Sequence, residues 1–500
     1  MYSLIKFTPR KYQESIFQSA KEKNTLVVLP TGIGKTAIAL LLILERLNRF
    51  PDSKVIFLSP TKPLCSQHYE TIKKHTNIEK EKITLYTGNL SPEARKELFE
   101  SSKVIIATPQ TIQSDLKNKR ISLKDISLLI IDEAHKTVKN YSYNILASIY
   151  RDYSLHPLIL ALTASPGSNK EKINEIKNNL FIENIEIRTE EDSDVSPYLQ
   201  KKNIEWVKVT LPQEILEIHD NLKKVQNEKL SELKKFGVTK PIYVINKKDL
   251  LLLLQRFRKE INKKNPAGFY GISLISQLLK LSHALEILET QTIDSFRDFF
   301  DKMKTEKTKA SINILSNPEI KSALLKLENL KNKTHPKLEK LMEIIKEQLE
   351  INTDAKIMIF ANYRNTVSIL ASELSKIENA KVIKLLGQKE GITQKHQLKA
   401  INDFENNNFN IIIATSVGEE GLSINTLDLV IFYESVPSSI RRIQRSGRVA
   451  RTKPGKIIFI IAEKTQDEAF YWKSLKEEKR MKHILKNMQG KDKNSQSKLV

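Results

Sequence analysis

Two stretches of alternating strand and helix patterns, separated by a purely helical stretch, constrain the fold of this chain more than any other feature. In the first stretch, short runs rich in Val, Ile and Leu predict buried strands at 25–29, 55–59, 104–108, 128–131 and 158–162. Helical patterns lie between these runs, for example at 36–48 and 92–99. Strands that alternate with helices predict a parallel sheet covered by helices on both faces.

The same alternation returns near the other end of the chain, where strands are predicted at 356–361, 381–386, 410–415, 429–433 and 456–461. We therefore predict an α/β chain with two parallel-sheet domains, at 1–202 and 334–465, and an all-helical insertion at 212–333. A strand within 203–211 is expected to join the second sheet from a distance. Residues 466–500 are expected to form a C-terminal helix and a polar tail that frays from Gly490.

The chain is strongly basic, with 82 Lys and Arg against 59 Asp and Glu and a formal net charge of +23. Such a surface attracts polyanions, so nucleic acid is the first expected partner and an anionic membrane the second. Residues 221–310 carry 19 Lys and Arg against 10 Asp and Glu. Their net positive charge per residue is about twice that of the whole chain. Within the insertion, the residues expected to contact nucleic acid are Lys247, Lys248, Arg256 and Arg258.

Membrane insertion and export are not expected for this chain. Its apolar runs fall far short of the ~20 residues that cross a bilayer, and the first residues lack a signal-peptide pattern. Cys65 is the only cysteine, which excludes an intramolecular disulfide and a cysteine-based zinc site. We expect a cytoplasmic, nucleoid-associated protein in a prokaryote, or a nuclear protein in a eukaryote.

The segment LVVLPTGIGKTAIALLLIL has a strand, a tight loop and a helix in the order that binds a nucleotide phosphate. Glycines let backbone N–H groups approach phosphate oxygens, Lys35 adds a mobile charge, and Thr36 can bind Mg²⁺. The loop residues expected to contact ATP are Thr31, Gly32, Ile33, Gly34, Lys35 and Thr36. Leu29 stands where the general pattern has glycine. A glycine-containing turn before an ordinary helix is the alternative interpretation.

About 97 residues after Lys35, the segment ISLLIIDEAH ends a predicted strand in two adjacent carboxylates. Asp132 can hold Mg²⁺ through water, while Glu133 can orient and deprotonate the water that attacks the γ-phosphate. His135 is expected to link this pair to the rest of the core. The alternative is a strand that exits into a solvated acidic loop, but the pairing with PTGIGKT favours an ATPase.

The segment SSIRRIQRSGRVAR places arginines at 441, 442, 445, 448 and 451 on one predicted helix of the second α/β domain. Arginine can stabilise the charge that spreads over a transferring phosphoryl group, and a second domain that supplies it makes hydrolysis depend on domain closure. The alternative is a basic helix that faces solvent or a DNA backbone, which applies above all to Arg441, Arg442 and Arg445.

Eight segments in order resemble the motif set of superfamily two helicases. They are RKYQ at 10–13, PTGIGKT at 30–36, SPTKPL at 59–64, TPQT at 108–111, DEAH at 132–135, TAS at 163–165, ATSVGEEGLSI at 414–424 and QRSGRVAR at 444–451. Within that superfamily the chain most resembles the archaeal Hef helicases and the Fanconi anaemia M-type translocases, above all in VGEEGLSINTLDLVIFYESVPSSIRRIQRSGR and EAFYWKSLKEEKRM. The resemblance implies two RecA-like domains that use ATP and Mg²⁺.

The resemblance also implies roles for single residues. Arg10 and Gln13 are expected to contact adenine, and Gln444, Arg448 and Arg451 to face the γ-phosphate from the second domain. The positions implied for coupling of the ATP site to nucleic acid are Thr163 and Ser165. The positions implied along the bound strand are Thr61, Lys62, Thr108, Pro109, Asn362 and Thr415.

Two positions depart from the family pattern, since Ser423 replaces a usual Asp and Ala450 a usual Gly. The Asp that Ser423 replaces is implied by the family pattern to make a nucleotide or interdomain contact. Hef proteins often continue into an XPF-type nuclease, but EEKR at 477–480 lacks the surrounding acidic residues of that site. No nuclease is therefore expected.

The predicted function is an ATP-driven DNA motor that acts on forks or junctions, together with replication or repair proteins. Two alternatives stay open. A double-stranded-RNA translocase is one, because helicases related to Dicer carry a similarly placed helical insertion. A scaffold that binds nucleic acid without hydrolysis is the other, and the intact Lys35, Glu133, Arg448 and Arg451 argue against it.

Overall fold

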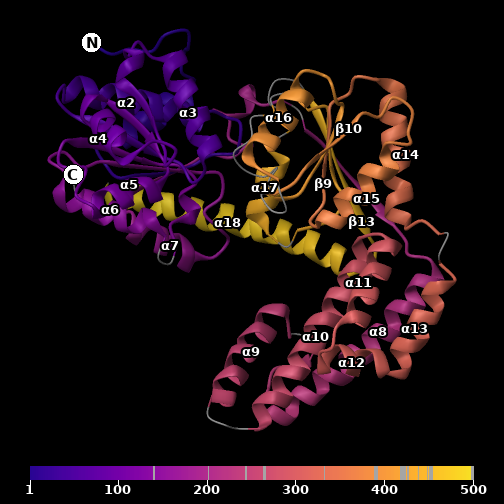
Figure 1. Cartoon of the computed structure of the whole chain (residues 1–500). Coiled ribbons are helices and arrows are strands. Elements are labelled where there is room, and N and C mark those ends of the chain that lie inside the picture. The colour runs from indigo at the N-terminus through magenta and orange to yellow at the C-terminus, as the bar shows by residue number, and fades with distance from the viewer. Residues whose placement is uncertain are drawn as a thin grey trace.

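The computed structural model describes all residues except 139–140, 201, 243–244, 263–265, 331–332, 388–391, 417–423, 425–426, 437, 448, 450–453 and 497–500. The described residues form two parallel sheets, each flanked by helices, and a helical bundle that projects away from them (Figure 1). The predicted fold class, two parallel-sheet domains with a helical segment between them in the chain, is therefore confirmed.

The first sheet contains seven parallel strands in the order β3-β4-β2-β5-β6-β1-β7. Its strands are β1 (Thr25–Val28), β2 (Lys54–Leu58), β3 (Ile83–Tyr86), β4 (Val104–Ala107), β5 (Ile126–Ile131), β6 (Ile159–Thr163) and β7 (Asn184–Ile187). The two outermost strands, β3 and β7, were not predicted. Polar residues separate the apolar ones in both strands, Thr84 in β3 and Asn184 and Glu186 in β7, so neither forms the continuous apolar run by which the other strands of this sheet were predicted.

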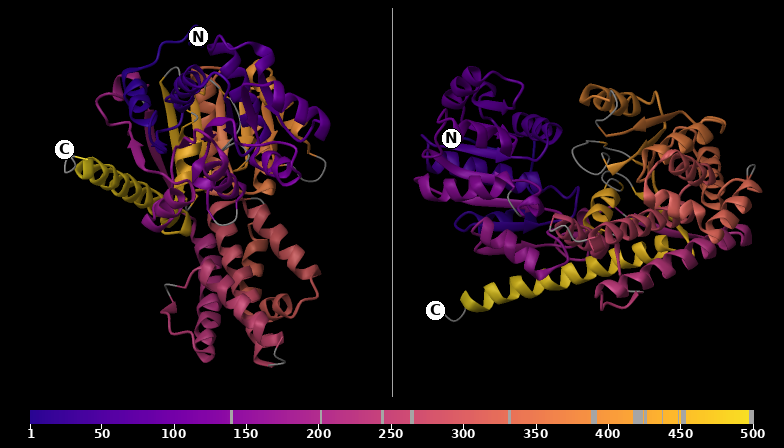
Figure 2. Two further views of the ribbon diagram at one scale, coloured as in Figure 1. Left: turned by 90° about the vertical axis from the view of Figure 1, so that its left-hand side faces the viewer. Right: turned by 60° about the horizontal axis from the view of Figure 1, so that its bottom comes forward.

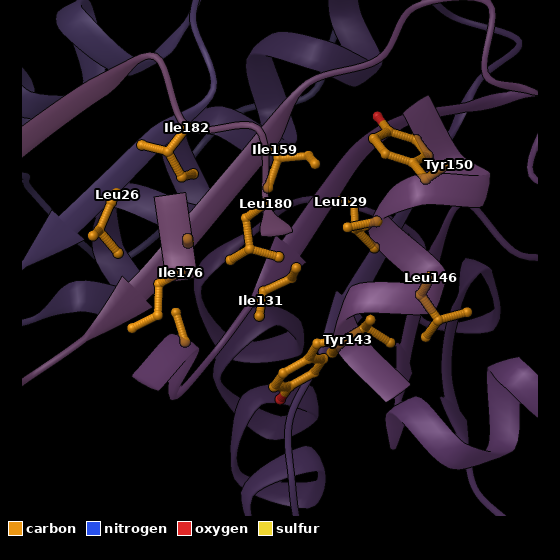
Figure 3. Packing of buried hydrophobic residues seen from close by; sticks show 14 of the residues in the cluster. Leu26, Leu129, Ile131, Tyr143, Leu146, Tyr150, Ile159, Ile176, Leu180 and Ile182 are labelled. Atoms are coloured by element: carbon orange, nitrogen blue, oxygen red, sulfur yellow. The ribbon is translucent and has the colours of Figure 1, made fainter. Parts of the chain in front are cut away.

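Helices cover both faces of the first sheet. They are α1 (Lys11–Ala20), α2 (Lys35–Arg49), α3 (Lys62–His75), α4 (Pro92–Ser101), α5 (Pro109–Lys117), α6 (Ser142–Tyr153) and α7 (Lys170–Asn179). On one face, Tyr143 and Tyr150 of α6 and Ile176 of α7 pack against Leu129 and Ile131 of β5 (Figure 3). The strands are buried on both faces, which explains why they read as continuous apolar runs.

The second sheet contains six parallel strands in the order β10-β11-β9-β12-β13-β8. Its strands are β8 (Lys202–Val209), β9 (Ile357–Phe360), β10 (Val382–Leu385), β11 (Ile411–Ala414), β12 (Leu429–Phe432) and β13 (Gly455–Ala462). Edge strand β8 pairs with β13 along its whole length, although the insertion lies between them in the sequence. The helices of this region are α14 (Pro336–Ile351), α15 (Arg364–Leu374), α16 (Gln394–Glu405) and α17 (Ser439–Ser446).

The insertion is a bundle fixed to the second sheet domain at one end. Its helices are α8 (Gln213–Glu232), α9 (Lys247–Asn262), α10 (Pro266–Thr290), α11 (Ile293–Thr305), α12 (Lys309–Ser316) and α13 (Pro318–Glu328). At the fixed end, buried Glu289 accepts a hydrogen bond from the N–H of Gln466 at 2.6 Å. Gln291 Oε1 accepts another from the hydroxyl of Thr366 at 3.0 Å. These bonds tie the bundle to the second domain.

The last helix, α18 (Gln466–Gln496), begins on the second sheet domain and runs along the first (Figure 2). The prediction of a frayed tail from Gly490 is wrong for the described residues, because the helix continues to Gln496. A single glycine in a helix costs only about 1 kcal/mol relative to alanine, and the surrounding Lys and Gln residues favour helix. Among the described residues, no helix combines the length and the apolar character that crossing a bilayer requires.

Candidate ATP and nucleic-acid site

The predicted ATP motifs meet at the carboxyl edge of the first sheet. PTGIGKT follows β1, DEAH follows β5, and TAS begins at the last residue of β6. These three strands are neighbours in the order β5-β6-β1. Parallel strands end at the same edge of a sheet, so loops that are far apart in sequence come together there. The structure therefore brings the predicted residues of the first domain into one place.

The loop before α2 has the backbone that a phosphate cradle needs. Gly32 and Gly34 both have φ of 84°, a left-handed conformation that favours glycine. A Cβ on Gly34 would lie 2.4 Å from Gln13 Nε2, so space as well as conformation requires glycine there. Lys35 is the first residue of α2, and its Nζ donates to the carbonyl of Leu29 at 3.1 Å. Leu29, the departure from the general pattern, is a fully buried core residue.

Helix α1 packs its polar residues against this loop. Gln13 Nε2 lies 3.3 Å from the carbonyl oxygens of Ile33 and Gly34, and Gln13 Oε1 accepts from the N–H of Arg10 at 2.9 Å. The hydroxyl of Tyr12 also donates to the carbonyl of Ile33. Burial raises the pKa of Tyr12, so this hydroxyl stays a donor. Sequence reasoning missed Tyr12, although it stands inside the RKYQ motif.

Asp132 is a buried carboxylate at the end of β5. Its Oδ2 lies 2.9 Å from Nε2 of His68 on α3, and the residue is 6% exposed. Burial acts to raise the pKa of Asp132, but the hydrogen bond from His68 and the nearby charge of Lys35 outweigh it and lower this pKa. The carboxylate is therefore ionised at neutral pH. Sequence reasoning missed His68, because no motif spacing connects α3 with DEAH.

Glu133 has a left-handed backbone, with φ of 50°. Such a conformation is uncommon for a residue with a side chain and often marks a functional site. Glu133 Oε2 lies 3.1 Å from Nδ1 of His135, and the same nitrogen lies 3.2 Å from Oγ1 of Thr163. The N–H of Ser165 donates to that Thr163 oxygen at 3.2 Å. The predicted coupling residues His135, Thr163 and Ser165 therefore form a series of contacts that starts at Glu133.

Helix α17 of the second domain reaches the phosphate loop of the first. A Cβ on Gly447, at the end of this helix, would lie 1.3 Å from Oγ1 of Thr31, so only glycine permits this approach. Ile443 of the same helix packs against the core of the first domain. The two domains are thus in direct contact at the predicted ATP site.

Helix α17 is shorter than predicted. It ends at Ser446 and is capped by Gly447, a poor helix former, so the predicted helix through position 451 is wrong where the structure describes it. The predicted site residues Arg448 and Arg451 lie outside the described residues, as do the two departures Ser423 and Ala450. The remaining predicted residue, Gln444, lies on α17 and is 3% exposed.

Two arginines of α17 are buried, which contradicts the interpretation that they face solvent or DNA. Arg442 forms an ion pair with Glu478 of α18. Arg445 is fully buried, and its Nη2 donates to Oδ1 of Asn362 at 3.2 Å while its guanidinium lies 4.8 Å from the ring centroid of Phe360. A buried guanidinium needs such partners, and the folded domain provides them. Only Arg441 of the three is exposed.

The first-domain residues predicted along the nucleic-acid strand begin two neighbouring helices. Thr61 and Lys62 start α3 after β2, while Thr108 and Pro109 start α5 after β4, and β2 pairs with β4. Both threonines are N-cap residues with extended backbone. Two helix N-termini side by side present backbone N–H groups and positive potential, which suits phosphate.

In the second domain, the residues predicted along the nucleic-acid strand also follow two paired strands. Asn362 follows β9 and Thr415 follows β11, and these two strands pair. The N–H of Asn362 donates to buried Glu434, and burial raises the pKa of Glu434 to about 8. Glu434 therefore carries a proton at neutral pH. Sequence reasoning missed this residue, because a single carboxylate in a loop carries no signal of burial.

Comparisons with known proteins cover the chain in three parts. A model described as “DEAD/DEAH box helicase” matches residues 10–173, and “Helicase conserved C-terminal domain” matches residues 336–453. A model described as “Putative ATP-dependent RNA helicase, helical bundle” matches residues 214–334, which hold the insertion.

Curated relatives are longer than this chain. The chain is 40% identical to “Putative ATP-dependent RNA helicase MJ1505” of Methanocaldococcus jannaschii, over 96% of this chain and 61% of that protein. It is 32% identical to “ATP-dependent DNA helicase fml1” of Schizosaccharomyces pombe, over 92% of this chain and 57% of that protein. The chain thus spans about three fifths of the length of these two relatives.

A solved structure matches nearly from end to end. The helicase domain of Pyrococcus furiosus Hef is 43% identical, has a TM-score of 0.73, and is covered over 98% of its length by 93% of this chain. Sequence motifs, sheet order and this match agree. The chain belongs to the Hef family of DEAD/DEAH box helicases.

Proposed function

We propose that the chain is an ATP-driven DNA motor that acts on forks and junctions in replication or repair. The contact of Gly447 with Thr31 carries this proposal, because it joins the arginine helix of one domain to the phosphate loop of the other. A nucleotide between the two domains can then couple hydrolysis to their relative movement. Relatives whose names read DNA helicase support DNA as the substrate.

In this proposal Lys35 binds the ATP phosphates at the N-terminus of α2. The hydroxyl of Thr36 and the ionised carboxylate of Asp132 would hold Mg²⁺, which prefers oxygen ligands and neutralises charge on the phosphates when bound. Glu133 orients the attacking water and accepts its proton. His135 lies between Glu133 and Thr163 and transmits the state of this site.

The second domain contributes residues to both the ATP site and the surface that binds one nucleic-acid strand. Gln444, Arg448 and Arg451 are assigned to the γ-phosphate side, and Arg10 and Gln13 to adenine. The helix N-termini at Thr61–Lys62 and Thr108–Pro109 are assigned to the phosphates of one strand, together with Asn362 and Thr415. Phosphate contacts of this kind set the position of the protein on the strand without reading its sequence.

The insertion binds a duplex arm of the DNA in this proposal, and this contact is called the grip below. On α9 the side chains of Lys247, Lys248, Arg256 and Arg258 are exposed. Of the two acidic residues on α9, Asp249 is paired with Lys240, with 2.6 Å between Nζ and Oδ2. Exposed cations on a bundle that projects from the core suit phosphates beyond the single-strand track.

ATPase stimulation across nucleic acids tests the proposal. Single-stranded DNA, forked DNA, four-way junctions and double-stranded RNA are compared at one salt concentration, and forks or junctions should stimulate most. Double-stranded RNA is the second candidate, because two relatives and the helical-bundle model carry RNA helicase names. Stronger stimulation by double-stranded RNA than by any DNA would refute the DNA assignment.

Active-site variants test the assigned chemistry. Lys35→Ala should weaken ATP binding and hydrolysis together, whereas Glu133→Gln should keep ATP bound while turnover nearly stops. Replacement of Arg448 or Arg451 should lower turnover by ~10³-fold with little loss of ATP affinity. Near-normal turnover of Glu133→Gln would show that another group activates the water.

A charge-neutralised insertion tests the grip. Each duplex phosphate contact contributes a slope of about −0.9 to the plot of log affinity against log salt. Neutralising Lys247, Lys248, Arg256 and Arg258 should flatten this slope on junctions and spare single-strand ATPase. Neutralising Lys346, an exposed lysine of the second domain, is the control. Equal losses on junctions and single strands, or none on either, would reject the insertion as the grip.

A further inference from the structure

Helix α18 is held on the second domain at its first turns. Asp467 forms a fully buried ion pair with Lys337 of α14, with 2.7 Å between Oδ2 and Nζ. Four residues later, Tyr471 packs edge-on against Phe459 of β13, with 5.0 Å between ring centroids. The start of the helix therefore moves with the second sheet.

The middle of the same helix belongs to the core of the first domain. Met481 and Leu485 are 3% and 0% exposed, and they lie in one apolar cluster with Leu26 of β1 and Ile185 of β7. Figure 2 shows the helix running along this domain. One rigid helix is thus anchored on both domains, and a change in their relative position must act on it.

One side chain of α18 touches the coupling motif. The hydroxyl of Ser165 donates to Sδ of Met481 at 2.9 Å. Ser165 is bonded through its N–H to Oγ1 of Thr163, which lies 3.2 Å from Nδ1 of His135, the neighbour of Glu133. A series of side-chain contacts therefore leads from the DEAH segment to the helix that is anchored on the other domain.

The preceding turn of α18 touches the arginine helix. Glu478 pairs with Arg442 of α17 and lies 3.2 Å from Nζ of Lys482. Met481 and Arg442 also line one cavity of about 120 Å³ beside Thr31 of the phosphate loop. Within one turn, α18 thus meets both the motif that follows β6 and the helix that approaches the phosphate loop.

We infer that Met481 is a positioning residue that ties the coupling motif of the first domain to α18, and through α18 to the second domain. The inference rests on the proposed function, since it assigns a role in its domain coupling. A thioether is a weak hydrogen-bond acceptor, so the contact contributes little to folding. Its effect is to set where Ser165 lies when the domains move, and with it the Thr163 and His135 contacts.

Met481→Leu tests this role, because it keeps the apolar volume and removes the sulfur acceptor. Stimulation of ATP hydrolysis by nucleic acid, the ratio of stimulated to basal kcat, should fall roughly threefold, because a weak hydrogen bond shifts an equilibrium by no more than its own small free energy. The KM for ATP and the thermal midpoint should stay at the parent values. Leu485→Met, one turn away in the same cluster, is the control and should keep full stimulation.

A double-mutant cycle separates positioning from packing. Ser165→Ala breaks the same contact from the other side, so Met481→Leu on that background should add nothing. Parental stimulation in Met481→Leu, or effects that multiply in the double variant, would overturn the inference. If Met481→Leu lowers the thermal midpoint, Met481→Gln restores an acceptor and should recover stimulation, and failure to recover it would count against the inference. A parent chain that nucleic acid does not stimulate would instead refute the proposed function.

Discussion

The buried ion pair that starts α18 leads to a prediction about stability. Lys337 Nζ lies 2.7 Å from Asp467 Oδ2, and neither side chain is exposed. Asp467 also accepts from the backbone N–H groups of Ser435 at 2.8 Å and Ala462 at 3.2 Å. Lys337→Met keeps most of the side-chain volume but leaves the buried carboxylate without its cation.

Removal of one partner from a buried pair costs about 3–5 kcal/mol. Because two backbone donors still bind Asp467, we expect a loss near the lower end, about 3 kcal/mol in the unfolding free energy. Urea denaturation measures it through tryptophan fluorescence. The chain has 2 tryptophans, Trp206 on β8 and Trp472 on α18, so the signal reports on the second domain.

Lys340→Met on the same helix is the matched control. Its Nζ lies 2.7 Å from Oε2 of Glu343, but the side chain is 40% exposed, so the loss should stay within about 0.5 kcal/mol. In the double variant Lys337→Met with Asp467→Asn, the uncompensated charge is gone, and about 1 kcal/mol or more should return. Equal urea midpoints for Lys337→Met and Lys340→Met would refute the reasoning.

Three further predictions concern single side chains. Burial raises the pKa of Glu434 from 4.5 to about 8, so the folded state retains a proton that the unfolded chain releases. The stability this group contributes is present below about pH 4.5 and is lost as pH rises to about 8. Relative to the parent, Glu434→Gln should therefore gain urea stability at pH 8 and gain little at pH 5; an equal difference at both would contradict the burial argument. Gly447→Ala places a Cβ 1.3 Å from Thr31 Oγ1, so stimulated kcat should fall by ~10²-fold, whereas Gly88→Ala, with nothing within 4 Å, should keep it. Burial raises the pKa of Cys65 to about 12, so a thiol reagent should label it only after unfolding, and rapid labelling of the native chain would show that the site opens.

The fold was predictable where a pattern repeats over many residues. Buried strands of parallel sheets are apolar on both faces, and strands such as β1 and β12 stood out for this reason. The edge strands β3 and β7, in which polar residues separate the apolar ones, did not. Periodicity also reveals that α18 is a helix without revealing what it packs against. Met481 and Leu485 are four residues apart on one face, and that spacing fits burial on either domain.

The candidate site was predictable where its chemistry is local. A strand that ends in Asp132 and Glu133, or a loop that ends in Lys35, carries its signal within a few residues. His68 and Glu434 act across the fold, on Asp132 and on the N–H of Asn362. Their importance comes from burial and from partners on other elements, which spacing within one segment does not encode.

The polar contacts at the base of the insertion bear on how a motor of this design would transmit force. Three groups of the insertion form buried hydrogen bonds to the second domain. They are the side chains of Glu289 and Gln291 and the carbonyl of Leu288, which lies 3.2 Å from Nε2 of His335. Bending at this junction would leave those groups without partners in an apolar setting, at a cost of about 1–3 kcal/mol for each. Rigid rotation of the insertion together with the second domain avoids that cost. A rotation driven at the ATP site would then displace the far end of the bundle most, where α9 carries the exposed cations assigned to the duplex.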